Sequence, residues 1–139
     1  MDQKLLKLAI DAMQNAYAPY SNFQVGSAIR SSSGKVYSGA NVENAAYPEG
    51  CCAEASAISA MILDGERIIL DIVVVGKGDG LVTPCGGCRQ KIREFSTQDT
   101  RVYVCDPDGL RKTYTIEQLL PDSFGPKILS NNHINALQS

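Results

Sequence analysis

Hydrophobic and polar residues are spaced along the first 42 residues in a way that predicts one helix followed by a hairpin. Apolar residues recur at helical spacing from Asp2 to Ala16, which predicts an amphipathic helix. Pro19, in the segment APYS, ends it because proline cannot continue a helix. Alternation from Phe23 to Ile29 and the stretch VYSGANV at 36–42 predict two strands, which the turn SSSGK joins into a hairpin.

The pattern then changes to helices that alternate with strands. A helix is predicted from about Cys52 to Leu63, and another is predicted to begin near Cys85. The near-continuous apolar run from Ile68 to Val75 predicts a strand that is buried on both faces. Two further strands are predicted at 101–105 and 112–115, around a turn at 106–109 and before the short stretch IEQLL. This alternation predicts an α/β fold in which helices cover a central sheet.

Length and composition predict a single globular domain over residues 1–139. The chain has the commonest size of one domain, and it contains no repeat, linker or low-complexity segment. The tail from Lys127 is polar and is predicted to be loosely ordered. The net charge of −2 argues against a nucleic-acid partner, because duplex binding requires a basic surface.

The N-terminal segment and the cysteine count bear on the compartment. The first residues mix charged and apolar groups, unlike a signal peptide, and no apolar stretch reaches the roughly 18 residues of a membrane span. A cytoplasmic protein with no membrane contact is therefore expected. Five cysteines in a reducing compartment do not favour disulfides, so clustered cysteines indicate metal binding or catalysis.

Two cysteine-containing segments can supply a zinc site. Cys85 and Cys88, in TPCGGCRQ, lie three positions apart and would share one face at the start of a helix, where amides and the helix dipole favour thiolates. A third ligand is expected from EGCCAEA. Cys52 is preferred to Cys51 because Glu54 then follows two residues later. Three protein ligands leave a position for water, as in catalytic zinc sites.

The spacing of these residues matches the signature of zinc deaminases, in which a ligand, one residue and a glutamate precede P-C-x-x-C. Glu54 would then not be a ligand but would carry protons from the attacking water to the departing amine. Three thiolates and one zinc ion have a formal charge of about 2 − 3 = −1. Positive potential is therefore needed nearby, and the helix N-termini at Cys52 and Cys85 would supply part of it.

Other interpretations of the same residues explain less. A thioredoxin-type redox pair would account for C-x-x-C but not for C-A-E, and a zinc ribbon would need a second C-x-x-C. Cys105 falls in an apolar strand and is predicted to be a core thiol. His133 is the only histidine and lies in the polar tail, which disfavours a histidine-based triad. The joint pattern favours zinc-dependent hydrolysis.

The chain resembles the cytidine deaminase family, of the small homotetrameric type. The resemblance is carried by YSNFQVGSAI at 20–29, GANVENAAYPEGCCAEASAI at 39–58, PCGGCRQKIREF at 84–95 and LLPDSFGP at 119–126. It implies a three-layer α/β/α fold with a five-stranded mixed sheet, one zinc ion per chain, and hydrolysis of cytidine and 2′-deoxycytidine to the uridines with release of ammonia. Cys52, Cys85 and Cys88 would hold the zinc, and Glu54 would transfer protons.

The resemblance also implies a nucleoside-binding site. Asn41 and Glu43 match a ribose-binding pair, although pattern alone favours the polar end of a strand. Phe23 matches an aromatic residue near the base, although pattern alone favours a core position, and the backbone amide of Ala53 matches a contact to the pyrimidine carbonyl. The positions that match contacts made from neighbouring subunits are Ala45, Tyr47 and Phe124. The resemblance therefore implies a homotetramer whose sites are completed by neighbouring subunits.

One position departs from the family pattern. Ala55 stands where members with three cysteine ligands commonly carry arginine, so Arg89 or backbone amides would have to offset the thiolate charge. Two other functions stay open. One is deamination of a cytosine nucleoside antibiotic such as blasticidin S, against which LLPDSFGP favours cytidine. The other is a non-catalytic, zinc-stabilised binding module, which would have no use for Glu54.

Overall fold

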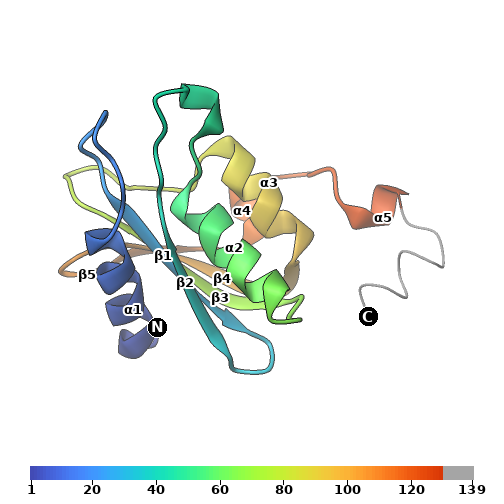
Figure 1. The fold of residues 1–139 in the computed structure, drawn as a ribbon. Helices are drawn as coiled ribbons and strands as arrows, with labels where there is room; N and C mark the ends of the chain where they lie inside the picture. The colour runs from blue at the N-terminus through green and yellow to red at the C-terminus, as the bar shows by residue number, and fades with distance from the viewer. Residues whose placement is uncertain (130–139) are drawn as a thin grey trace.

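A five-stranded mixed sheet forms the centre of the computed structural model, which describes residues 1–129 (Figure 1). The strand order is β2-β1-β3-β4-β5. β3 and β4 are parallel, whereas the other neighbouring strands are antiparallel. The strands are β1 (Val25–Ser31), β2 (Val36–Ala40), β3 (Ile69–Gly76), β4 (Ser96–Asp106) and β5 (Gly109–Tyr114). The predicted hairpin and the mixed sheet are confirmed.

Helices cover both faces of the sheet. The helices are α1 (Gln3–Gln14), α2 (Ala53–Leu63), α3 (Gly86–Glu94), α4 (Ile116–Leu119) and α5 (Pro126–Leu129), with a 3-10 turn η1 (Tyr47–Glu49). Ala28 and Val73 face a core cluster with α1, whereas their neighbours Ile29 and Ile72 face a second cluster with α2, α3 and α4. Successive strand residues point to opposite faces, so the predicted three-layer α/β/α arrangement is confirmed.

The first helix shows how the sequence builds one outer layer. The Asp2 side chain caps α1 by accepting a hydrogen bond from the Lys4 amide at 2.9 Å. An apolar stripe on α1 is buried against the sheet, and it consists of Leu5, Leu6, Ala9 and Met13. The helix approaches β1 closely at Gly26, where an added Cβ would lie 2.0 Å from the Ala9 carbonyl oxygen. Only glycine fits this contact.

Three predictions about local structure were inaccurate. Phe23 precedes β1 and is 42 % exposed, because Asn22 adopts a left-handed φ of 57° and turns the chain before the strand. β4 begins at Ser96 rather than at 101. The Thr100 hydroxyl donates to the Ile69 carbonyl at 2.6 Å, and this bond holds residues 96–100 beside β3. Leu70 is 39 % exposed where the β3–β4 register shifts, so β3 is not buried on both faces throughout.

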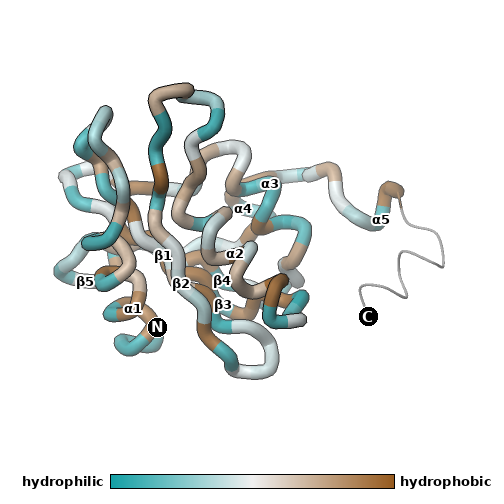
Figure 2. The backbone as a smooth tube through the Cα atoms, in the orientation of Figure 1, coloured by the Kyte–Doolittle hydropathy of each residue, from teal (hydrophilic) through white to brown (hydrophobic). Residues whose placement is uncertain are grey.

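Two further predictions concern the ends of the chain and membrane contact. No helix within residues 1–129 is long and apolar enough to cross a membrane. The polar tail was predicted from Lys127, but residues 126–129 form α5, whose Ile128 and Leu129 are exposed and hydrophobic (Figure 2). The rest of that tail, including His133, lies outside the described residues.

α2 and α3 begin at the same end of the sheet, which places the two cysteine segments together (Figure 1). The chain reaches α2 from the end of β2 and reaches α3 from the end of β3. Gly39 lets α2 lie close to β2, since a Cβ there would be 2.5 Å from the Ala57 amide nitrogen. The N-terminal turns of α2 and α3 therefore form the floor of one site.

Candidate metal centre and active site

Three thiols converge where α2 and α3 begin. Cys52 is the N-cap of α2, Cys85 is the N-cap of α3, and Cys88 is buried in the first turn of α3. Their sulfur atoms lie within 4.8 Å of one another, and those of Cys52 and Cys85 are 3.9 Å apart. Tetrahedral zinc with Zn–S bonds of about 2.3 Å separates two sulfurs by about 3.8 Å. The cluster therefore fits one zinc ion.

The other two cysteines are placed elsewhere. The Cys51 thiol contacts the Cys52 carbonyl oxygen and the Ser56 hydroxyl, each at 3.6 Å, and it does not belong to the cluster. Cys105 is buried in β4 beneath α1, and this burial raises the pKa of its thiol to about 11. The preference for Cys52 over Cys51 and the core position of Cys105 both agree with the structure.

The protein alone does not favour three thiolates at once. Burial raises the pKa of Cys52. Burial, and to a smaller extent the negative charge of Glu54, raises the pKa of Cys88. The pKa of Cys85 is lowered, chiefly by the Cys88 amide in the first turn of α3. A divalent cation reverses this balance, because a coordinating thiol is deprotonated outright. The donor set is therefore one whose charge a metal ion would stabilise.

Glu54 supplies a buried carboxyl group beside the thiols. It lies in the first turn of α2 and is 4 % exposed. Burial raises the pKa of Glu54, and this effect exceeds the opposing effects of hydrogen bonding, including one with the Cys88 side chain, and of the Lys91 charge. A carboxyl group with a raised pKa can both accept and return a proton near neutral pH.

A cavity of about 220 Å³ opens onto Glu54 and two of the thiols. Its lining residues are Phe23, Val25, Asn41, Cys52, Ala53, Glu54, Val74, Val82, Thr83 and Cys85. Phe23 thus faces the site and not the core, in agreement with the family resemblance and against its strand pattern. Val82 and Thr83 were missed, although they directly precede PCGGC. Val25 and Val74 were missed because they have the pattern of ordinary strand residues.

A second cavity of about 330 Å³ contains Glu43 and Tyr47. Its lining residues are Tyr20, Ser21, Glu43, Asn44, Tyr47 and Gly50. The rings of Tyr20 and Tyr47 meet edge to face, with centroids 5.9 Å apart. The segment 20–25 contributes residues to both cavities. Neither Tyr20 nor Ser21 was predicted as a site residue from the sequence.

Asn41 and Glu43 hold the segment 20–25 in place. The Asn41 side chain donates to the Phe23 carbonyl at 2.9 Å and accepts from the Val25 amide at 2.8 Å. Glu43 Oε1 accepts from the amides of residues 20 and 21 at 3.0 and 3.1 Å. The pKa of Glu43 is lowered, first by its hydrogen bond from the Ser21 side chain. The pair therefore fixes the loop that carries Phe23.

Two predicted site residues line neither cavity in this single chain. Ala45 is exposed on the loop before η1. Phe124 is 54 % exposed on the segment after α4, and its carbonyl accepts from Gln90 Nε2 at 2.8 Å. Arg93 Nε donates to the Ser123 hydroxyl at 2.8 Å, so α3 anchors this segment before it leaves the body of the molecule (Figure 1).

Two cations of α3, Arg89 and Lys91, flank the cysteine segment. Arg89 donates to the carbonyls of Pro84 at 2.8 Å and Leu119 at 3.0 Å, and to the Thr83 hydroxyl at 3.2 Å. These three hydrogen-bond partners of Arg89 are neutral groups. Lys91 Nζ lies 3.6 Å from the point that a Cβ on Gly87 would occupy, within the C-G-G-C turn. Lys91 therefore places a positive charge beside this turn, where it acts on the Glu54 carboxylate.

Fold and site together are those of a zinc-binding hydrolytic enzyme, with three thiols and a buried carboxyl group at the ends of two helices. Residues 1–105 match the family model described as "Cytidine and deoxycytidylate deaminase zinc-binding region". The chain therefore belongs to the cytidine and deoxycytidylate deaminase family.

Individual relatives and solved structures agree with this assignment. The chain is 43 % identical over 122 residues to a cytidine deaminase of Halalkalibacterium halodurans, covering 88 % of this chain and 92 % of that protein. It is 39 % identical over 128 residues to one of Sporosarcina psychrophila, covering 92 % and 94 %. The crystal structure of cytidine deaminase from Burkholderia pseudomallei superposes with a TM-score of 0.84 at 39 % identity, covering 89 % of this chain and 99 % of that one.

Proposed function

We propose that this protein hydrolyses cytidine and 2′-deoxycytidine to uridine and 2′-deoxyuridine and releases ammonia. The observation that carries the proposal is the buried Glu54 carboxyl group, which shares a cavity of about 220 Å³ with two of the three clustered thiols. A carboxyl group in that place has no role in a zinc-stabilised binding module. The cavity lies below the 300–1,000 Å³ range typical of drug-sized ligands and suits a small substrate.

Proton transfer is the role of Glu54. Cys52, Cys85 and Cys88 would hold zinc, which when bound lowers the pKa of a coordinated water and so supplies the nucleophile. Glu54 in its carboxylate form accepts the proton of the attacking water and delivers it to the ring nitrogen beside the attacked carbon. Glu54 then carries the remaining proton of the added water from the new hydroxyl group to the amino group. The C–N bond breaks, and ammonia leaves as the new carbonyl forms.

Residues around Glu54 would orient the pyrimidine. Ala53 is the first residue of α2 and is fully buried, and amides in a first helical turn have no partner within the helix. Its N–H can therefore bind the pyrimidine carbonyl. Phe23 lines the same cavity and offers an aromatic face to the base.

Asn41 and Glu43 would bind the sugar. Their contacts within residues 1–129 leave one N–H of the Asn41 amide and one acceptor site on Glu43 Oε2 unused, counting four sites per carboxylate. A hydroxyl group can donate to the carboxylate and accept from the amide at the same time. This combination supports a nucleoside in preference to the free base.

A homotetramer with shared sites accounts for the exposed apolar side chains. Tyr47 is 75 % exposed, and Phe124 on the anchored segment is 54 % exposed. Ile128 and Leu129 on α5 are each 63 % exposed. A neighbouring copy that covered these side chains would bring Ala45, Tyr47 and Phe124 to another chain's nucleoside. The same proposal includes a cytoplasmic location, where the five free thiols would stay reduced.

The test is the loss of ultraviolet absorbance when purified protein meets cytidine, with zinc content measured on the same sample. We expect turnover of cytidine and 2′-deoxycytidine with about one zinc ion per chain. Zinc without turnover of either nucleoside would contradict the proposal. Turnover of blasticidin S alone would assign the chain to antibiotic deamination. A monomer in size-exclusion chromatography would contradict the proposal that neighbouring subunits share the sites.

A further inference from the structure

We propose that Ser21 is a positioning residue that fixes the Glu43 carboxylate for a sugar hydroxyl and so sets the preference for nucleosides that carry ring hydroxyls. This inference rests on the proposed function, since it concerns the sugar-binding part of the same site. Ser21 lines the cavity that contains Glu43, two residues before Phe23 in the cavity that contains Glu54.

The contacts of Ser21 define its role. Its hydroxyl donates to Glu43 Oε2, and its backbone amide donates to Glu43 Oε1 at 3.1 Å. The Tyr20 amide adds a second hydrogen bond to Oε1 at 3.0 Å. Three donors on adjacent residues therefore hold both oxygens of one carboxylate, and bonds to a charged group are about twice as strong as neutral ones.

The direction of the Ser21 proton follows from its other partner. The Phe23 amide donates to Ser21 Oγ at 3.0 Å and occupies one of its two lone pairs. A hydroxyl carries a single proton, which here points to Glu43. The hydrogen bond to Phe23 closes a turn over Asn22, whose left-handed φ of 57° brings residues 21 and 23 together. Ser21 thus has one fixed orientation.

This orientation selects the carboxylate oxygen that a sugar meets. Oε1 already accepts two amides, whereas Oε2 accepts one hydroxyl and keeps an acceptor site. Without the Ser21 hydroxyl, Oε2 would be held by nothing among the described contacts and could turn or bind water. A sugar hydroxyl would then have to displace that water and order the carboxylate, which weakens binding.

Ser21 also connects the sugar part of the site with the base part. The Phe23 amide is held by Ser21, and the Phe23 carbonyl is held by the Asn41 side chain at 2.9 Å. A substitution that merely loosened this loop would therefore disturb the base as well as the sugar. A role limited to loop stability would weaken every cytosine nucleoside alike, whereas a role in orienting Glu43 would weaken only those with ring hydroxyls.

The experiment compares Ser21→Ala with the unaltered protein on cytidine and on 2′,3′-dideoxycytidine, which lacks both ring hydroxyls. We expect KM for cytidine to rise about tenfold, because one hydrogen bond to a charged group is lost. The value of kcat should change less than about twofold. KM for the dideoxynucleoside should change less than about threefold. Ser21→Thr, which keeps the hydroxyl, should restore cytidine binding, and Ser32→Ala, at the opposite end of β1, is the matched control.

Several outcomes would overturn the inference. These are an equal loss on both nucleosides, no change on either, and a loss in kcat with KM unchanged. If Ser21→Ala does not fold, Ser21→Cys, with a side chain of similar size and a weak donor, provides the same comparison. An unaltered protein that neither binds nor deaminates any cytosine nucleoside would refute the proposed function and the inference with it, whereas an active protein indifferent to Ser21 would refute the inference alone.

Discussion

The sulfur atoms of Cys52 and Cys85 lie 3.9 Å apart although 33 positions separate the two residues in the chain. Each cysteine occupies the N-cap position of a different helix, and the two helices begin at one end of the sheet. The short distance between Cys52 and Cys85 therefore depends on the packing of α2 and α3. The position of Cys88 relative to Cys85 depends only on the first turn of α3. Loss of any one thiol leaves a site with two ligands.

Replacement of Cys88 by serine should remove zinc from the protein. Cys88 is the buried member of the cluster, so no external ligand can take its place. Zinc content measured by atomic absorption should fall from about one ion per chain to nearly none. Cys51→Ser is the matched control, because its thiol lies outside the cluster, and it should retain zinc. Equal zinc loss in both variants would count against the assigned ligand set.

Glu54→Gln should abolish turnover and leave zinc in place. The amide keeps the shape of the side chain but cannot accept a proton from water, and general acid–base catalysis contributes at least about 10²- to 10⁴-fold. We expect kcat for cytidine to fall by at least that factor, with zinc content and melting temperature close to those of the unaltered protein. Residual activity within tenfold would exclude Glu54 as the proton carrier.

Lys91→Met should weaken zinc retention. The Lys91 ammonium lies over the C-G-G-C turn and attracts the Glu54 carboxylate, whereas the Arg89 guanidinium donates to neutral oxygens. Lys91 is exposed, so we expect transfer of zinc to a chelator to quicken only about two- to fivefold, and less at high salt. Lys4→Met removes the same charge far from the site as a control. Identical transfer rates in the two variants would show that the Lys91 charge does not affect zinc retention.

Gly39→Ala should destabilise the fold and disturb the active-site helix. The new Cβ would lie 2.5 Å from the Ala57 nitrogen and 2.6 Å from the Ala53 oxygen, both backbone atoms that cannot move aside alone. Overpacking of this kind costs about 1–3 kcal/mol, which denaturant unfolding can measure. Gly80→Ala, where an added Cβ meets nothing within 4 Å, should change the free energy of unfolding by less than about 0.5 kcal/mol.

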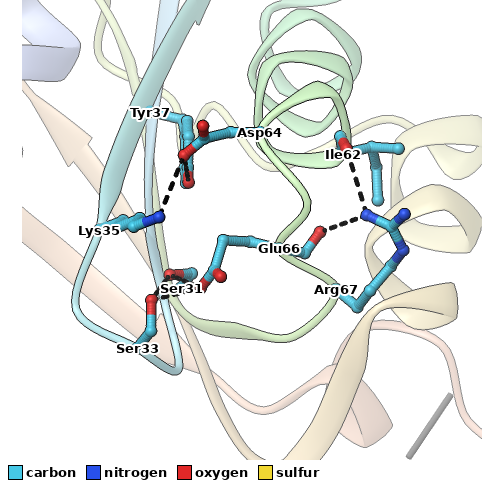
Figure 3. Close-up of polar contacts among 8 residues, drawn as sticks. All are labelled: Ser31, Ser33, Lys35, Tyr37, Ile62, Asp64, Glu66 and Arg67. Carbon is cyan, nitrogen blue, oxygen red and sulfur yellow. Dashed lines mark hydrogen bonds and ion pairs between the residues drawn. The ribbon is translucent and has the colours of Figure 1, made fainter.

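Acid should weaken a polar contact that joins the β1–β2 hairpin to the end of α2 (Figure 3). Glu66 accepts hydrogen bonds from Ser31, at 2.6 Å, and from Ser33, and these bonds lower its pKa below the ordinary value of 4.5. Beside it, Asp64 accepts from Tyr37 at 2.6 Å, and this bond lowers the pKa of Asp64. A carboxylate with a lowered folded pKa stabilises the protein above pH 4.5, and this contribution disappears as pH falls through the folded value.

Glu66→Gln should therefore show a smaller loss of melting temperature than the unaltered protein on acidification below pH 4.5. Asp99→Asn, an exposed change on β4, is the control and should keep the original pH dependence. Parallel curves for Glu66→Gln and the unaltered protein would show that this contact contributes nothing to acid stability.

Local chemistry explains why much of the molecule could be predicted. The 3.6-residue period of α1 and the apolar run of β3 are local patterns, and both elements form where they were expected. The three-residue spacing of Cys85 and Cys88 follows from helix geometry, whereas Cys52 and Glu54 were identified by their match to the zinc deaminase signature. The same signature joined the two segments, and the family resemblance then named the nucleoside.

Contacts between distant segments decided the rest. The sequence by itself determined the three longer helices, the five strands and the ligand types, because these depend on neighbours in the chain. Only the tertiary structure placed Val82 at the site, Arg89 on neutral carbonyls and Ser21 beside Glu43, which is 22 positions away. Side-chain hydrogen bonds of this kind depend on how loops cross the end of the sheet. No local periodicity records that crossing, so the positions of these side chains could not be deduced from spacing.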